Sequence, residues 1–154
     1  MKNTYALIIG ISDYENIQSL QFADQDALAM EDFLSGEWGA NIPKENIRLL
    51  LNNHAKNGDI LENGMTWLYD KVKQGDRAII YFAGHGISVG NNDAYLLSYN
   101  TIQEFNTANI FMSGGIPMLQ VKRNFIAPMH QNGVQVLLII DACRSFDIAR
   151  IIKE

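Results

Sequence analysis

The stretch VQVLLIIDACRS, residues Val134–Ser145, decides the fold because it joins a buried strand to reactive side chains. Six of its first seven residues are aliphatic, which is typical of a strand in the middle of a sheet. An acid, the only cysteine of the chain and a base follow, as Asp141, Cys143 and Arg144. Polar residues that directly follow a buried strand lie where α/β proteins build their binding sites.

The rest of the chain alternates between apolar runs and helical patterns. Short apolar runs predict strands over 4–10, 45–51, 76–84 and 134–140. Apolar residues at helical spacing predict helices over 22–34, 59–74 and 116–133, the last kinked or ended early by Pro128 and capped by Gly133. A hairpin is expected over 87–98 and a loop over 99–115. This order predicts an α/β fold, a mostly parallel sheet sandwiched by helices.

Length, charge and cysteine content restrict the class of protein. The chain of 154 residues predicts one domain, residues 1–154. A net charge of −5 without a basic run argues against nucleic-acid binding as the main activity. No stretch reaches 18 apolar residues, so no membrane span is predicted. A single cysteine forms no internal disulfide, and a cytoplasmic location is therefore expected.

Two strand ends carry residues suited to nucleophilic catalysis. His85 follows the strand over 76–84, in YFAGHG (81–86), and Cys143 follows the last strand. The thiolate of a cysteine is the nucleophile, and a nearby imidazole can take up the thiol proton and return it to a departing amine. Gly84 and Gly86 allow a tight turn and leave room for an incoming backbone.

Each of these residues also has a structural interpretation. A lone cysteine after a buried strand is usually a small core residue, and a lone histidine is more often structural. Because His85 and Cys143 occur together at two neighbouring strand ends, we favour a catalytic dyad over these two structural interpretations. His54 and His130 lie outside the strand ends, so no catalytic metal site is predicted. The loop GISDYEN (10–16) lacks the glycines of a phosphate-binding loop.

These motifs together resemble the caspase-like cysteine peptidases, and most closely the metacaspase-like branch. YFAGHG (81–86) and DACRS (141–145) resemble the histidine and cysteine motifs of that family. Residues 5–34 resemble the branch's opening, a strand followed by a Gly-Ile-x-x-Tyr turn and an Asp-Ala helix. The resemblance implies a caspase–hemoglobinase fold. It also implies that residues 1–154 are the large catalytic portion, which a small C-terminal portion or another chain would complete.

The resemblance assigns the chemistry to individual residues. It makes Cys143 the nucleophile and His85 the general acid/base, with no third member. The backbone N–H groups of Gly86 and Cys143 would stabilise the oxyanion. No cofactor is implied. Because some metacaspases need calcium, an activating calcium ion stays open.

Acidic residues near the cysteine suggest the substrate class. By resemblance, Asp141 lines the pocket for the residue before the scissile bond, where a carboxylate would attract arginine or lysine. Asp13 is a second candidate substrate-binding acid. The structural alternatives are a strand-end cap for Asp141 and a turn former for Asp13. The acids over 24–32 are interpreted as the solvated face of a helix.

The sequence therefore predicts a cysteine endopeptidase that cleaves after basic residues of a protein or peptide. Residues beside the cysteine depart from the family pattern: Arg144 stands where histidine is common, and Phe146 stands where glycine is usual. These departures leave a non-catalytic caspase-like interaction module as an alternative. A nucleotide-binding α/β domain is a third interpretation, supported by the fold class alone.

Overall fold

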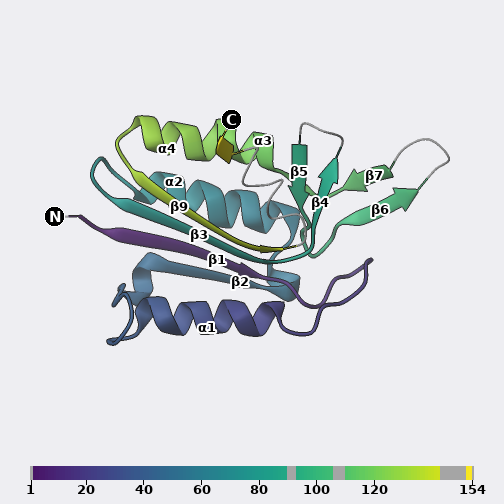
Figure 1. Ribbon diagram of the computed structural model, residues 1–154, viewed down its shortest axis with the longest axis horizontal. Helices are drawn as coiled ribbons and strands as arrows, with labels where there is room; N and C mark the ends of the chain where they lie inside the picture. Colours follow the sequence, from purple (N-terminus) through teal and green to yellow (C-terminus); the bar gives the residue numbers. More distant parts are fainter. Residues whose placement is uncertain (1, 90–92, 106–109, 143–151, 154) are drawn as a thin grey trace.

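A four-stranded parallel sheet forms the centre of the protein (Figure 1). The computed structural model describes residues 2–89, 93–105, 110–142 and 152–153. The strand order is β2-β1-β3-β9. These strands comprise β1 (Thr4–Gly10), β2 (Ile47–Leu51), β3 (Arg77–Gly84) and β9 (Gln135–Ala142). The predicted α/β class and all four predicted strands are confirmed.

Helices cover both faces of this sheet, as Figure 1 shows. Helix α1 (Ala23–Ser35) packs on one face, against Ala6, Ile8 and Tyr81. The other face buries Leu7 and Phe82 under the remaining helices. Those are the π-helix η3 (Asp59–Thr66), α2 (Trp67–Lys71), α3 (Met118–Val121), the π-helix η4 (Lys122–Ile126) and α4 (Ala127–Gln131). Burial on both faces explains the unbroken aliphatic runs of the central strands.

The predicted helix over 116–133 is shorter and less regular than expected. Its first two residues form β8 (Ile116–Pro117), which pairs with a neighbouring strand, so the helix begins at Met118. The π-helical turn of η4 leads directly into α4, which contains Pro128. Proline cannot donate the regular helical hydrogen bond, and a π-turn is one way in which a helix continues through such a gap. The C-cap of α4 is Asn132, and the predicted glycine stop follows it, with Gly133 in the left-handed region at a φ of 79°.

Antiparallel strands extend from the carboxyl end of β3. The predicted hairpin is confirmed as β4 (Gly86–Val89) and β5 (Asp93–Leu96), and β8 completes a three-stranded sheet with them. The predicted loop over 99–115 is wrong, because it contains the two-stranded ribbon β6 (Ile102–Phe105) and β7 (Ile110–Ser113). The ribbon lies apart from the main sheet (Figure 1).

A polar network fixes the loop after β1 to α1 and to the end of β2. The Ser12 hydroxyl accepts from the Asp24 backbone N–H at 3.0 Å and donates to the Asp24 carboxylate at 2.8 Å. The Asn52 amide donates to the same carboxylate at 3.2 Å and accepts from the Ser12 backbone N–H at 2.9 Å. Asn52 adopts a φ of 48°, in the left-handed region that asparagine tolerates better than most residues.

The network also sets the protonation of Asp24. Burial raises the pKa of this carboxyl, but hydrogen bonds from Ser12, Asn52 and the Gln25 backbone together outweigh burial and hold the pKa below its usual value. A carboxyl with a lowered folded-state pKa stabilises the protein above the pKa of the unfolded chain. This stabilisation is lost as the pH falls through the folded-state pKa.

We expect Asp24→Asn to lower the free energy of unfolding by about 1–3 kcal/mol at neutral pH, because an amide cannot accept from Asn52 and from the α1 backbone in the same way. The deficit should narrow as the pH falls below about 4. Urea unfolding at a series of pH values measures both effects. Asp32→Asn, an exposed position on the same helix, is the control. Equal stability of Asp24→Asn and wild type at neutral pH would contradict the prediction.

Candidate active site

The parallel pairing of β3 with β9 brings the two motif-bearing strand ends together. The register pairs Ala83 with Asp141 and Gly84 with Ala142. His85 and Cys143 each follow the last pair by one residue, which fits the expectation that they end neighbouring strands. Cys143, with its thiol and backbone N–H, lies outside the described residues. Strand β9 runs two residues beyond the predicted end at Ile140, so Asp141 belongs to the strand itself.

His85 is held by hydrogen bonds on its backbone and on its ring. Its N–H donates to the Tyr14 hydroxyl at 2.7 Å, and its carbonyl accepts from the Leu97 N–H at 3.0 Å. The imidazole Nε2 lies 2.7 Å from the Gln18 carbonyl oxygen. A carbonyl only accepts, so Nε2 carries a hydrogen and Nδ1 of the neutral ring is the free base.

Tyr14 packs directly against His85. The centroids of the two rings are 4.9 Å apart with a tilt of 48°. The Tyr14 hydroxyl, which accepts from His85, donates to the Leu97 carbonyl at 3.3 Å. One phenol thus joins the loop after β1 to the two ends of the β4–β5 hairpin, His85 before β4 and Leu97 after β5. Burial raises the pKa of Tyr14, against a smaller lowering by the hydrogen bond from His85, and the phenol stays protonated.

Gly84 is required by the position of Tyr14. A Cβ atom on Gly84 would lie 2.6 Å from the Tyr14 hydroxyl oxygen, which is closer than real contacts allow. The sequence predicts that this glycine leaves room for a substrate backbone, whereas in the structure it leaves room for a tyrosine. The role of Tyr14 is not predicted from sequence, although its Gly-Ile-x-x-Tyr motif carries the signal.

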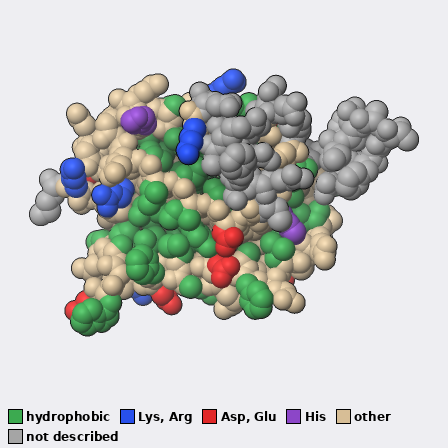
Figure 2. All heavy atoms as spheres, viewed as in Figure 1, with side chains coloured by type: hydrophobic (Ala, Val, Ile, Leu, Met, Phe, Trp, Pro, Cys, Tyr) green, Lys and Arg blue, Asp and Glu red, His purple; other side chains and the backbone are tan. Residues whose placement is uncertain are grey.

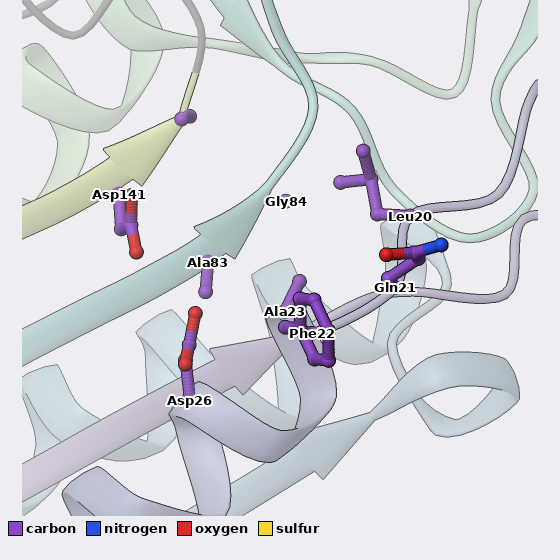
Figure 3. A pocket seen from close by; sticks show the side chains of 9 residues that line it. Leu20, Gln21, Phe22, Ala23, Asp26, Ala83, Gly84 and Asp141 are labelled. Atoms are coloured by element: carbon purple, nitrogen blue, oxygen red, sulfur yellow. The ribbon is translucent and has the colours of Figure 1, made fainter.

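A hollow of about 280 Å³ opens at the ends of β3 and β9 (Figure 3). The lining residues come from the loop before α1, the first turn of α1 and the two strand ends. They are Leu20, Gln21, Phe22, Ala23, Asp26, Ala83, Gly84, Asp141 and Ala142. Figure 3 shows Asp141 and Asp26 near Ala83, with Leu20 and Gln21 farther across the hollow, so two carboxylates from different elements share one part of the lining.

Both carboxylates act on the same buried phenol. Burial raises the pKa of Tyr81, and the charges of Asp141 and then Asp26 raise it further. Tyr81 lies on the face of β3 that is covered by α1. The two acids therefore produce one negative field on that face of the sheet, which favours a cation in the hollow. On the surface drawn in Figure 2, acidic side chains lie together at the border of an apolar area.

The other predicted acids and histidines lie elsewhere. Asp13 is exposed, and its backbone N–H donates to the Asn52 side chain at 3.1 Å, at the β2 side of the rim rather than in the lining of the hollow. Asp26 is exposed, as expected for a solvated helix face, and it also lines the hollow. His54 and His130 are exposed. The described part of the chain contains no cluster of three or more His, Cys, Asp or Glu side chains that could hold a metal ion.

Sequence comparisons relate the chain to proteases. The sequence profile of the caspase domain of peptidase family C14 matches residues 3–152. Metacaspase-1 from Plasmodium falciparum is 26% identical over 155 residues, which cover 91% of this chain and 23% of that protein. A probable protease from a Desulfuromonadales bacterium is 30% identical over 98 residues, which cover 54% of this chain and 12% of that protein. The chain thus matches less than a quarter of the length of these relatives.

A solved structure shares the fold. The crystal structure of protein GSU0716 from Geobacter sulfurreducens superimposes with a TM-score of 0.66 at 16% sequence identity. The superposition covers 93% of this chain and 51% of that protein. No helix in the described ranges is long and apolar enough to cross a membrane.

We expect Tyr14→Phe to destabilise the protein by about 1–3 kcal/mol, because the partly buried His85 N–H loses its acceptor while the ring stays in place. The same change should shift the NMR resonances of the His85 imidazole and leave those of exposed His54 and His130 in place. Tyr69→Phe, at a 36% exposed position on α2, is the control. Unchanged His85 resonances in Tyr14→Phe would show that Tyr14 does not set the environment of this ring.

Proposed function

Because the chain belongs to the caspase-domain family of cysteine proteases, we propose that it is the catalytic part of an endopeptidase that cleaves after arginine or lysine. One observation carries the proposed specificity. Asp26 and Asp141 face a single hollow beside the turn that holds His85. A cationic side chain in that hollow would place the peptide bond that follows it next to His85 and the position after Ala142.

The proposed chemistry is acyl transfer to Cys143. His85 Nδ1 takes the thiol proton, and the thiolate sulfur bonds to the carbonyl carbon of the scissile peptide. The C–N bond then breaks as the imidazolium gives its proton to the leaving amine, which leaves a thioester. Water, deprotonated by His85, attacks this thioester and releases the acid and the thiol. Backbone N–H groups of Gly86 and Cys143 would stabilise the oxyanion in both steps.

The hydrogen bond between His85 Nε2 and the Gln18 carbonyl supports the proposed role of the histidine. It fixes the ring plane and keeps the hydrogen on Nε2, as a general base with a free Nδ1 requires. It also offers a polar partner to the imidazolium that forms during the reaction. A backbone carbonyl thus performs the orienting part that a carboxylate performs in other triads.

The outer edge of β9 supports a companion segment. Among the described strands β9 pairs with β3 alone, and its Leu137 side chain is 47% exposed. An open strand edge presents unpaired N–H and C=O groups, which are a template for pairing with another strand. We therefore place a further segment of a longer protein, or a second chain, beside β9, where it would also border the hollow. Calcium activation stays an open part of this proposal.

We expect Cys143→Ala and His85→Ala each to lower cleavage of arginine- and lysine-terminated fluorogenic peptides by at least about 10³-fold. The assay uses the protein as isolated, with any chain that copurifies, in the presence of calcium and of excess chelator. His130→Ala, an exposed histidine on α4, is the control for the histidine variant. Equal rates in wild type and Cys143→Ala would exclude the proposed activity.

We expect Asp26→Asn and Asp141→Asn each to reduce kcat/KM for a basic substrate by about tenfold or more, because each removes one charge that faces the cation. A peptide with glutamine before the scissile bond should respond much less. Asp32→Asn on α1 serves again as the control. If both site variants cleave basic peptides as fast as wild type, the hollow does not bind the basic residue.

A further inference from the structure

One large apolar side chain at the hollow has no structural explanation in the fold. Phe22, the residue directly before α1, is 65% exposed and lines the hollow. Figure 3 shows its ring beside Ala23 at the rim. Phe33 on the same helix is similarly exposed, so exposure alone is not the signal. What distinguishes Phe22 is its place in the lining of a hollow that also contains two carboxylates.

The position of Phe22 relative to Asp26 is fixed by the helix. The Asp26 N–H donates to the Phe22 carbonyl at 2.8 Å, the first hydrogen bond of α1. Phe22 is the N-cap residue, with a φ of −128° and a ψ of 0°, so its side chain leaves the backbone just before the helical turn that carries Asp26. The ring and the Asp26 carboxylate both belong to the lining of the hollow, and Phe22 is the one aromatic residue among the described lining residues.

We infer that Phe22 makes the hollow selective for arginine over lysine, an inference that rests on the proposed cleavage after basic residues. A guanidinium is planar and weakly hydrated, so its face can stack on the ring while its N–H groups reach a carboxylate. An ammonium group is compact and strongly hydrated, and an apolar wall deprives it of water without offering a matching plane. Asp26 and Asp141 supply the charge preference, and Phe22 supplies the distinction between the two cations.

The test compares kcat/KM for two peptides that differ only in arginine or lysine before the scissile bond. We expect Phe22→Leu to lower the arginine-to-lysine ratio by roughly 3- to 10-fold, because leucine keeps the apolar wall but lacks the ring. Phe22→Met repeats this test with a second side chain of similar volume, and Phe22→Tyr, which keeps the ring, should retain the wild-type ratio. Phe33→Leu is the matched control, since Phe33 is 60% exposed on the same helix and does not line the hollow.

A readout independent of turnover uses the Cys143→Ala protein. Its thermal stabilisation by the arginine peptide should exceed that by the lysine peptide, and adding Phe22→Leu should remove the difference. An unchanged ratio in active Phe22→Leu and Phe22→Met would overturn the inference and leave the proposed function standing. Wild-type protein that cleaves neither basic peptide would overturn the proposed function, and the inference with it.

Discussion

The parallel pairing of β3 with β9 is the constraint on which the site depends. It places the ends of two strands at one rim, although His85 and Cys143 are 58 residues apart in the chain. Parallel strands require a crossover connection, and here the chain between β3 and β9 forms the antiparallel strands and the helices α3, η4 and α4. A change of register by one residue would turn Asp141 away from α1 and toward the opposite face, because neighbouring side chains of a strand point to opposite sides.

The loop between β1 and α1 supplies the groups that hold His85 and part of the lining of the hollow. It is closed by the hydrogen bond from the Leu20 N–H to the Ser12 carbonyl at 2.8 Å. From this one loop come the Gln18 carbonyl that orients the imidazole, the Tyr14 phenol that holds the histidine backbone, and the Phe22 wall of the hollow. The orientation of the proposed base and the shape of the proposed specificity pocket therefore depend on the same segment.

The sequence predicted the strands of the main sheet well because burial on two faces leaves short aliphatic runs that end at glycine or polar residues. It failed at β6 and β7, because residues 99–115 show no clean period in the sequence. The position of Asp26 in the lining of the hollow was not predicted, for a different reason. Helical periodicity separates apolar from polar positions, but which polar position points over the carboxyl ends of the strands depends on how α1 crosses the sheet. Tyr14 was missed because its partners lie more than 70 residues away in the chain.

Two acids in the first turn of α1 have different roles: Asp24 belongs to the hydrogen-bond network, and Asp26 lines the hollow. Asp24 and Asp26 are two residues apart, so their side chains leave the helix about 200° from each other. Asp24 therefore points to Ser12 and Asn52, where hydrogen bonds hold its pKa low and anchor the loop that carries Gln18 and Tyr14. Asp26 points to the hollow and to Asp141. The Asp24 carboxylate is already hydrogen-bonded within the protein, so it is not available to a substrate cation. The proposed specificity therefore depends on Asp26, and the helical period directs the two side chains to different sides of α1.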